Sequence, residues 1–400
     1  MKETPNHSAP LLWVTTLMFS ITFLVAAVGV PVYGMTHGFD FSQWMMMLTT
    51  VALCGISITA GYHRLWSHNA YNGHFLIRLF FAFWGTHALQ NSILVWASGH
   101  RRHHRHIDDN DKDPYSIKRG FWFAHIGWML RAYPSGEEDF SNAKDLMKDP
   151  IVAFQHKHYV LLALSSNILL PLLLGVIHGD IVGTMLLVGV LRIVITHHTT
   201  FFINSLAHMW GKQPYTDTNT AKDSPLIALL TYGEGYHNFH HHFQTDYRNG
   251  VRWWQFDPTK WLISGLSWVG LASDLRRIPT FKIREAQIKM QFSQASQQLE
   301  SSHLANLEAW KSSLEKEYEE FLVTLSEWTA LRSEWYQTKR QSLQDALQGA
   351  LQGKKEALQF KWEFAAVTTR FKEMEYTLKM QQKRLKLYTL NFQAAGLQTA

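Results

Sequence analysis

The stretch IVGTMLLVGVLRIVITHHTTFFINSLAH, residues 181–208, joins the two features that decide the fold of this chain. Its first part, Ile181 to Ile203, is predominantly apolar and has the length of about 20 residues that a bilayer-spanning helix needs. Its end, Asn204-Ser-Leu-Ala-His208, places a histidine directly beyond the span. Because neutral imidazole is a good ligand for iron, zinc or copper, the stretch predicts a membrane helix that ends at a metal site.

Three further segments have a similar length and composition: Leu11–Val32, Trp44–Gly61 and His158–Ile177. The first is too long for a cleaved signal peptide. The stretch Phe75–Trp96 is apolar but interrupted by polar residues, so we expect a helix that packs against the bundle or lies in the membrane interface. The sequence therefore predicts an all-α fold built on a four-span transmembrane helix bundle.

Loop charge predicts the orientation of these spans. The short connections Tyr33–Ser42 and His178–Asp180 contain no Lys or Arg, whereas the segment Tyr62–Lys157 contains twelve. Cytoplasmic loops carry the excess of positive charge, so this segment and both termini are expected on the cytoplasmic side. The net charge of +6 comes without a basic stripe, which argues against a nucleic-acid partner, and the single Cys54 excludes an internal disulfide framework.

The chain changes character near residue 280. Residues 1–280 carry all 11 prolines and the apolar runs, which predicts a membrane-embedded domain, and residues 281–400 carry no proline. In the second part, apolar residues recur at heptad spacing, which favours a coiled-coil helical extension. Gly349 and Gly353 predict a turn of a hairpin near 349–353. The heptad positions are Leu307, Leu314, Phe321, Trp328 and Trp335, and then Phe360, Phe364, Val367, Phe371, Met374, Leu378, Leu385, Tyr388 and Phe392. An uncommitted charged helix, an oligomerisation arm and a dock for an electron donor are all compatible with this pattern.

Nine of the 22 histidines fall into four short clusters between residues 63 and 241. One such cluster alone could be a solvated basic patch. Two of the four, however, have the i, i+3, i+4 spacing that places three rings on one face of a helix, and two adjoin the ends of predicted spans. Nine imidazoles exceed what one ion can hold, so the clusters predict a dinuclear metal centre. The clusters contain His63 and His68, His100, His103 and His104, His208, and His237, His240 and His241.

Acidic residues near the clusters are expected to hold the second N–H of the ligating imidazoles. They are Asp108, Asp109, Asp111, Asp113, Glu234 and Asp246, although a solvated loop explains Asp109 and Asp111 equally well. His197 and His198 lie inside a predicted span, and we expect them to hydrogen-bond to metal ligands or carboxylates, with direct ligation as the alternative. Eight other histidines are expected at the surface or at interfaces: His7, His37, His74, His125, His156, His158, His178 and His303.

Four ordered motifs resemble the histidine boxes of the membrane Δ9 fatty-acyl desaturases of the stearoyl-CoA desaturase type. They are His63-Arg-Leu-Trp-Ser-His68, Trp96 to His104, Asn204-Ser-Leu-Ala-His208 and Gly233-Glu-Gly-Tyr-His-Asn-Phe-His-His241, and the likeness covers about residues 40 to 260. The resemblance implies two irons held by the nine clustered histidines, with Asn204 holding a water beside one iron, and O2 as co-substrate. It also places Gln90, Trp96 and Thr200 at the bend of an acyl tunnel.

Two departures from this resemblance concern the acyl carrier. The animal acyl-CoA enzymes carry Arg-Asp before the second box, where this chain has Ser98-Gly99, and Arg131-Ala-Tyr-Pro134 keeps only part of a second basic run. Lys118, Arg119 and Arg131 could still meet a phosphate, so CoA, acyl-carrier protein and phospholipid all stay open as carriers. The chain has no cytochrome b5-like His-Pro-Gly-Gly motif, so electrons are expected from a separate protein of ferredoxin, rubredoxin or cytochrome b5 type.

The leading interpretation is an acyl desaturase that inserts a cis double bond, at Δ9, into a saturated fatty-acyl chain. A histidine-box hydroxylase or ketolase would use the same metals but transfer oxygen to carbon. A metal-stabilised membrane scaffold with a coiled-coil assembly arm is the reading from a different class. The absent b5 domain, the altered carrier-facing residues and the tail predict a bacterial inner membrane rather than an endoplasmic reticulum.

Overall fold

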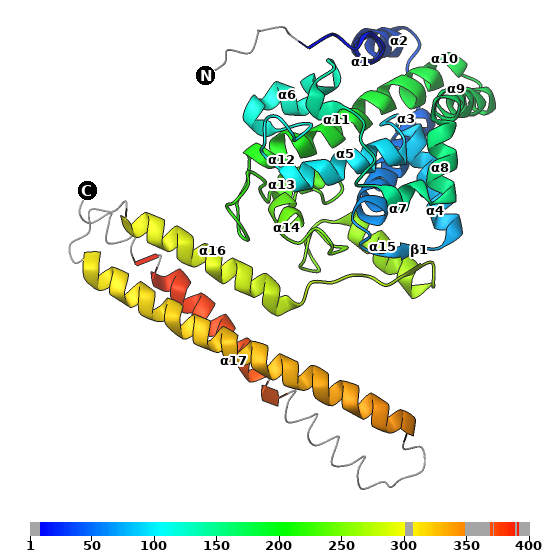
Figure 1. Cartoon of the computed structure of the whole chain (residues 1–400). Coiled ribbons are helices and arrows are strands. Elements are labelled where there is room, and N and C mark those ends of the chain that lie inside the picture. The colour runs from blue at the N-terminus through cyan, green and yellow to red at the C-terminus, as the bar shows by residue number, and fades with distance from the viewer. Residues whose placement is uncertain (1–8, 301–306, 349–368, 371, 389, 392–400) are drawn as a thin grey trace. The chain divides into compact units, whose positions relative to one another are not determined.

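The structure is a computed structural model that describes residues 9–300, 307–348, 369–370, 372–388 and 390–391. The chain divides into two compact units. The first unit runs to Gln213 and then from Asp217 to Ile278, and the second holds Pro214–Thr216 and the chain from Pro279 onward. Figure 1 shows the first unit as a cluster of helices and the second as long helices lying along one another.

Four helical segments are long and apolar enough to cross a membrane: Trp13–Thr36, Phe41–Ser67, Tyr159–His178 and Ile181–Met209. The prediction of an all-α membrane bundle with four spans is therefore confirmed. Two of the four run further than predicted, to Ser67 and Met209, and so carry His63 and His208 on the spanning helices themselves. The chain is an integral membrane protein.

The regular elements of the first unit are short apart from these spans. The helices are α1 (Trp13–Leu24), α2 (Val30–Thr36), α3 (Phe41–Ile56), α4 (Phe75–His87), α5 (Ile93–His106), α6 (Phe121–His125), α7 (Lys144–Met147), α8 (Pro150–Lys157), α9 (Tyr159–His178), α10 (Ile181–Thr184), α11 (Arg192–Asn204), α12 (Leu206–Met209), α13 (Pro225–Leu230), α14 (His237–His242) and α15 (Pro258–Trp268). The strands β1 (Asn72–Gly73) and β2 (Ala272–Ser273) pair antiparallel.

Three of the spans contain π-helical stretches, at Val25–Gly29, Ser57–Ser67 and Met185–Leu191. The second stretch is 11 residues long, is buried throughout, and ends beside His68. A π-helical turn adds a residue to the helical repeat, which changes the direction in which later side chains point, and such turns are frequent at functional sites. The stretch thus sets the directions of His63 and Arg64 at the end of the span.

The expectation of one helix over Phe75–Trp96 is wrong, because the chain breaks between α4 and α5. Leu89 and Asn91 have φ of 55° and 75°, and Ser92 accepts a hydrogen bond from the Val95 N–H as the N-cap of α5. The break changes the direction of the chain so that α5, which carries His100, His103 and His104, is a separate helix. The break contains neither proline nor glycine, and the residues there that favour a turn and an N-cap are Asn91 and Ser92.

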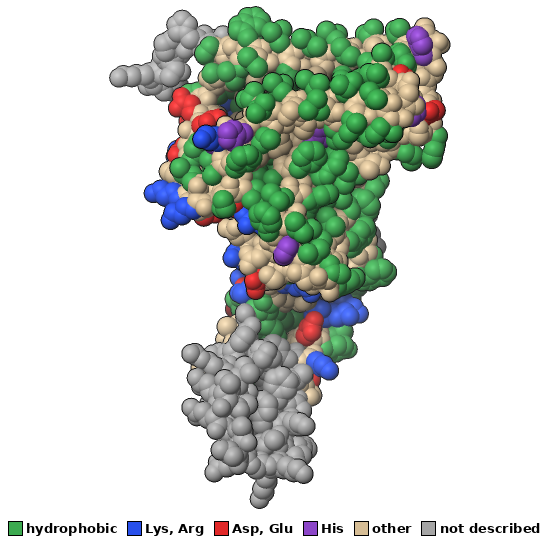
Figure 2. All heavy atoms as spheres, turned by 90° about the vertical axis from the view of Figure 1, so that its right-hand side faces the viewer, with side chains coloured by type: hydrophobic (Ala, Val, Ile, Leu, Met, Phe, Trp, Pro, Cys, Tyr) green, Lys and Arg blue, Asp and Glu red, His purple; other side chains and the backbone are tan. Residues whose placement is uncertain are grey.

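The faces of the spans differ in how far they are buried. Only 17% of the most apolar part of α9 is buried, compared with 56% for the span that contains α3. Figure 2 shows hydrophobic side chains gathered over the face of the first unit that includes α9. Exposed apolar side chains on α9 are Val160, Leu161, Leu164, Ile168, Leu169, Leu172, Leu173, Val176 and Ile177. An apolar outer face of this kind is what a helix in contact with lipid requires.

The second unit contains α16 (Thr280–Glu300), α17 (Leu307–Gln348) and a helical segment at 372–388. Its core includes Leu314, Phe321 and Trp328 from the predicted heptad row, together with Leu378 and Leu385. The coiled coil itself stays a prediction. The turn predicted at Gly349 to Gly353 lies outside the described residues, and so do Phe360, Phe364, Val367, Phe371 and Phe392 and the side chains of Leu307 and Trp335.

Candidate metal centre

The structure gathers the nine clustered histidines into two groups, in each of which the ligand atoms lie within 4.8 Å of one another. The first group has five members and the second has four. The first consists of His63, His68, His100, His104 and His240, and the second of His103, His208, His237 and His241. Seven of the nine side chains are buried, and the other two, His104 and His241, are partly buried.

Helices α5 and α14 each supply ligands to both groups. His100 and His104, one helical turn apart on α5, lie in the first group, and His103 between them lies in the second. On α14 the pattern is reversed, with His237 and His241 in the second group and His240 in the first. These two clusters were predicted to place three rings on one face of a helix, and the structure divides the rings of each between two neighbouring sites.

The distances between imidazole nitrogens fit a metal ion in each group. In the first group the Nε2 atoms of His63 and His240 are 2.9 Å apart, and those of His68 and His100 are also 2.9 Å apart. In the second group the Nε2 atoms of His208 and His237 are 3.1 Å apart. Nitrogens bound at right angles to one ion at about 2.1 Å would lie about 3.0 Å apart. The spacing is thus that of adjacent ligands on a shared ion.

Buried carboxylates determine which ring nitrogen of two histidines is free to bind a metal. His63 Nδ1 lies 2.9 Å from Glu234, and His103 Nδ1 lies 2.9 Å from Asp113. A carboxylate accepts a hydrogen bond, so each Nδ1 carries the proton and each Nε2 presents a lone pair to its group. These two contacts are among those expected from the sequence for Glu234 and Asp113.

A buried ion-pair network holds Glu234 in place. Arg64 donates to Glu234 at 2.8 Å and to Asp257 at 3.0 Å, and all three side chains are at most 1% exposed. Asn249 Nδ2 donates to the other Glu234 oxygen at 2.6 Å. Because Arg64 follows His63 in the chain, the network fixes both the carboxylate and the backbone that carries the histidine. Arg64, Asn249 and Asp257 were not predicted, since no spacing relates them to the histidine boxes.

His208 is oriented through a threonine that the sequence did not single out. Its Nδ1 lies 2.9 Å from Thr220 Oγ1, which donates to Asp108 at 2.6 Å. Asp108 thus acts on a ligand of the second group, as expected, but through Thr220 rather than directly. A similar contact joins His100 Nδ1 and the Tyr115 hydroxyl at 3.3 Å. A threonine or tyrosine in a loop gives no spacing signal, so sequence reasoning could not identify either.

Several expected polar contacts are absent from the described part of the chain or lie elsewhere. Asp246 pairs with Arg248 at 2.7 Å, and Asp109 accepts from its own loop, at the N–H groups of Asp111 and Lys112. The expected contacts of His197 and His198 with ligands or carboxylates are wrong. His197 Nε2 contacts the carbonyls of Ala88 and Leu89, and His198 Nδ1 lies 3.0 Å from His125, which is buried rather than at the surface.

Burial keeps six of the candidate ligands neutral at physiological pH, which a metal-binding imidazole requires. Burial, reinforced by neighbouring histidines, lowers the pKa of five of them well below the ordinary value. The five are His68, His100, His104, His240 and His241. Burial also lowers the pKa of His237, to about 3. The residues present thus offer the donor set that a pair of transition-metal ions needs.

Of the residues predicted at an acyl tunnel, Trp96 lies beside the first group. The ring of Trp96 is stacked on His100, with centroids 5.0 Å apart. Gln90, in the turn before α5, donates from Nε2 to Thr200 Oγ1 at 2.9 Å. Asn204 is the last residue of α11, four positions before His208, and is partly buried. The structure therefore brings Gln90 and Thr200 into contact and places Trp96 against a candidate ligand.

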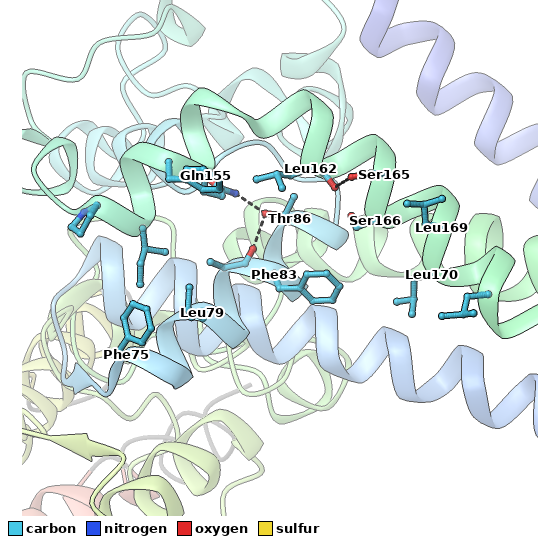
Figure 3. Close-up of a pocket in the computed structure, with 15 residues that line it drawn as sticks. Phe75, Leu79, Phe83, Thr86, Gln155, Leu162, Ser165, Ser166, Leu169 and Leu170 are labelled. Carbon is cyan, nitrogen blue, oxygen red and sulfur yellow. Dashed lines mark hydrogen bonds between the residues drawn. The ribbon is translucent and has the colours of Figure 1, made fainter.

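An apolar pocket of about 720 Å³ lies between α4, α8 and α9 (Figure 3). None of the nine histidines lines it. At its inner side Gln155 donates to Thr86 at 2.8 Å and to the Tyr62 hydroxyl at 2.8 Å. Since Tyr62 packs edge-on against Trp96, its ring lies between Gln155 and the residue that stacks on His100. The pocket is thus separate from the histidine groups.

The fold and the site together define a multi-pass helical membrane protein with two adjoining groups of histidines that could each hold a metal ion. The chain belongs to the fatty acid desaturase family, whose pattern matches residues 42–267. It is 44% identical to acyl-CoA desaturase 1 of Saccharomyces cerevisiae over 241 residues. These residues cover 60% of this chain and 47% of the yeast protein. It is 43% identical over 258 residues to the probable acyl-CoA desaturase of Schizosaccharomyces pombe, 64% of this chain and 54% of that protein.

A third relative is the Delta(9)-fatty-acid desaturase fat-6 of Caenorhabditis elegans. The identity is 35% over 281 residues, which cover 68% of this chain and 81% of the nematode protein. This chain spans about half the length of the two fungal proteins. The matched segment includes all nine histidines of the two groups.

Proposed function

We propose that this chain is an O2-dependent di-iron desaturase that introduces a cis double bond, at the Δ9 position, into a saturated fatty-acyl chain. The observation that carries the proposal is the pair of adjoining groups of five and four imidazole nitrogens, in a chain of the fatty acid desaturase family. The names of the two fungal relatives support acyl-CoA as the substrate class, and the name of the nematode protein supports Δ9.

In this proposal the first group holds one iron, and the second group, with a water held by Asn204, holds the other. When bound, two irons supply the oxidising power that removal of two hydrogens from unactivated methylenes requires. The reaction consumes O2, two electrons and two protons, and releases the alkene and two waters. The protein residues keep the ligands neutral and oriented, with Glu234 and Asp113 retaining the proton on Nδ1 of His63 and His103.

Selectivity for one pair of carbons is assigned to Gln90, Trp96 and Thr200. A methylene chain offers no polar handle, so its position relative to the metals must be set by the shape of the cavity that holds it. The contact of Trp96 with His100 places a large apolar surface beside the first group. The Gln90–Thr200 hydrogen bond joins the turn before α5 to α11 and supports a bend at this point.

The acyl carrier proposed here is coenzyme A, rather than acyl-carrier protein or a phospholipid. Lys118 is exposed and available to a phosphate. The Arg119 guanidinium is stacked over the rings of Phe123 and Tyr133, and Arg131 donates to the Ala9 carbonyl at 2.8 Å. Ser98, at the position of the missing Arg, is buried and bonded to Asn142 at 2.8 Å, so it does not replace the lost charge.

Electrons would reach the site from a separate redox protein of ferredoxin, rubredoxin or cytochrome b5 type. The positive charge of Tyr62–Lys157 supports a cytoplasmic position for the histidine groups. A bacterial inner membrane stays a prediction, and the three relatives named above are eukaryotic. Self-association through residues 281–400 is likewise a prediction.

The proposal is tested by expressing the chain, with a redox partner, in a host that lacks its own membrane desaturase. Total fatty acids are profiled by gas chromatography with mass spectrometry. The wild type should yield a new monoenoic acid, which a His240→Ala/His241→Ala variant should not. His242→Ala is the matched control, since this neighbour is exposed and lies in neither group, and it should retain the product.

Other products would move the chain to another class. A hydroxy or keto acid would identify a histidine-box hydroxylase or ketolase. Bound metal without any O2-dependent product, in the presence of a working reductase, would support a metal-stabilised scaffold.

A further inference from the structure

The turn that carries Gln90 has an unusual backbone conformation at Leu89. Leu89 and Asn91, on either side of Gln90, have φ of 55° and 75°. Asn adopts such angles more often than other L-residues, but Leu seldom does and keeps them only where the surrounding structure fixes them. The contacts that hold residues 88–92 therefore determine where the Gln90 side chain lies.

Helix α11 supplies the contacts on one side of the turn. His197 Nε2 lies 3.1 Å from the Ala88 carbonyl and 3.0 Å from the Leu89 carbonyl, so the ring donates one N–H shared between the two. Arg192 Nη1 donates to the His87 carbonyl at 2.6 Å. Three consecutive carbonyls, at the end of α4 and the start of the turn, are thus bound by two side chains of one helix.

Helices α8 and α9 hold the other side of the turn. The Tyr159 hydroxyl accepts the Asn91 N–H at 2.8 Å, and Gln155 Oε1 accepts the Ile93 N–H at 3.0 Å. Gln155 is the side chain at the inner side of the pocket in Figure 3. The turn is therefore held at its carbonyls by α11 and at its N–H groups by α8 and α9.

Arg192 is unusual because it is a fully buried charge inside a spanning segment. Its hydrogen bonds go to neutral acceptors: the Val188 carbonyl, the His87 carbonyl and Asn167 Oδ1. A charged side chain inside a membrane is costly, and such residues generally have a functional role. The contact that leaves the spanning helices is the one to His87, at the base of the Gln90 turn.

The same helix receives the Gln90 side chain. Gln90 Nε2 lies 2.9 Å from Thr200 Oγ1 and 3.4 Å from the Thr196 carbonyl. Three side chains of α11 therefore contact one turn. Arg192 and His197 bind its backbone carbonyls, and Thr200 binds the side chain of Gln90. Displacing the backbone carbonyls would displace the Gln90 amide from Thr200.

We propose that Arg192 and His197 are positioning residues that fix Gln90 against Thr200 and so determine which carbon pair of the acyl chain is desaturated. The inference rests on the proposed function, because it assigns these two residues to the selectivity of that same site. Neither residue belongs to the two histidine groups. Their role is to hold the shape of the cavity and not to take part in the reaction.

The test compares His197→Ala with His198→Ala, two neighbours on α11 of which only the first contacts the turn; His198 contacts His125. Each variant and the wild type are expressed in the desaturase-free host, and the double-bond isomers are separated by mass spectrometry of dimethyl disulfide adducts. Loss of one hydrogen bond changes an equilibrium about fivefold. The ratio of the main isomer to its neighbours should thus fall about fivefold or more in His197→Ala and stay unchanged in His198→Ala.

An unchanged isomer ratio in His197→Ala, at any turnover, would overturn the positioning role, because a merely structural residue alters yield and not regiochemistry. If His197→Ala does not accumulate, His197→Leu fills the space without a donor and must give the same shift. Arg192→Lys retains the charge but cannot match the guanidinium contacts, and should also broaden the isomers. Absence of any monoenoic product from the wild type would count against the proposed function instead.

Discussion

Replacing Glu234 by Gln tests how the polar network orients a metal ligand. The carboxylate is 1% exposed and accepts four N–H groups: His63 Nδ1 at 2.9 Å, Arg64 Nη2 and Nε at 2.8 and 3.2 Å, and Asn249 Nδ2 at 2.6 Å. A Gln side chain has nearly the same shape but has one accepting oxygen, and its NH2 would face donors. Two of the four contacts would then be lost or repulsive.

The size of the effect follows from what remains. Removing one partner of a buried ion pair costs about 3–5 kcal/mol of the free energy of unfolding. Arg64 keeps Asp257, with contacts at 3.0 and 3.1 Å, so we expect a value near the lower end, about 3 kcal/mol. The neutral amide is also a weaker acceptor for His63 Nδ1 than the carboxylate, so the tautomer of His63 is less firmly fixed, which should weaken metal binding in the first group about 10- to 100-fold.

The assay uses purified full-length protein in one detergent. Thermal unfolding of the metal-free protein reports stability, and metal retained against increasing chelator reports affinity. Glu138→Gln makes the same chemical change at an exposed position and should leave both measurements as in the wild type. A Glu234→Gln protein with unchanged unfolding temperature and unchanged metal retention would refute the reasoning that this network orients His63.

Three further changes test other parts of the structure. Asp113→Asn replaces the charged acceptor of His103 Nδ1 by a weaker neutral one and should lower metal affinity about 10- to 100-fold in the chelator assay, while Asp109→Asn, on its own loop, should not. Gly85→Ala would force a methyl group into the Tyr62 ring and should lower stability by about 1–3 kcal/mol in thermal unfolding. Gly99→Ala is the control, because a methyl group at Gly99 would have no atom within 4 Å. A similar loss of stability in Gly99→Ala would argue against the packing explanation. Phe321→Ala should destabilise the second unit by about 3–5 kcal/mol, because the ring is fully buried. Hydrogen exchange in α17 should then be faster than in the wild type, and an unchanged exchange rate would contradict this prediction.

The membrane fold was predictable because a bilayer imposes length and apolarity on every span. Both properties are visible in Ile181–Ile203 without any knowledge of tertiary contacts. The break between α4 and α5 was not predictable, because it depends on contacts made by residues distant in the chain. Those contacts are the bonds from Arg192 and His197 to the carbonyls of the turn.

The candidate ligands were predictable from spacing, but their division between two sites was not. The i, i+3, i+4 pattern of His100, His103 and His104 places them on one face of α5. The way α14 crosses this face decides that His103 pairs with His241 while His104 pairs with His240. A crossing of two helices is tertiary information, which periodicity within one helix does not contain.

The partners that orient the ligands show the same limit. Glu234 and Asp113 could be predicted because acidic residues stand out near histidine boxes. Thr220 and Tyr115 could not, because neutral hydroxyl side chains are common in loops and only their contacts with His208 and His100 distinguish them.

The most direct test of the central claim is the iron content of the purified chain after anaerobic loading with ferrous iron. The two histidine groups predict two tightly held ions per chain, falling to one in His100→Ala, from the first group, and to one in His241→Ala, from the second. This measurement needs neither the redox partner nor O2. A folded wild-type protein that retains one ion or none would contradict the dinuclear centre.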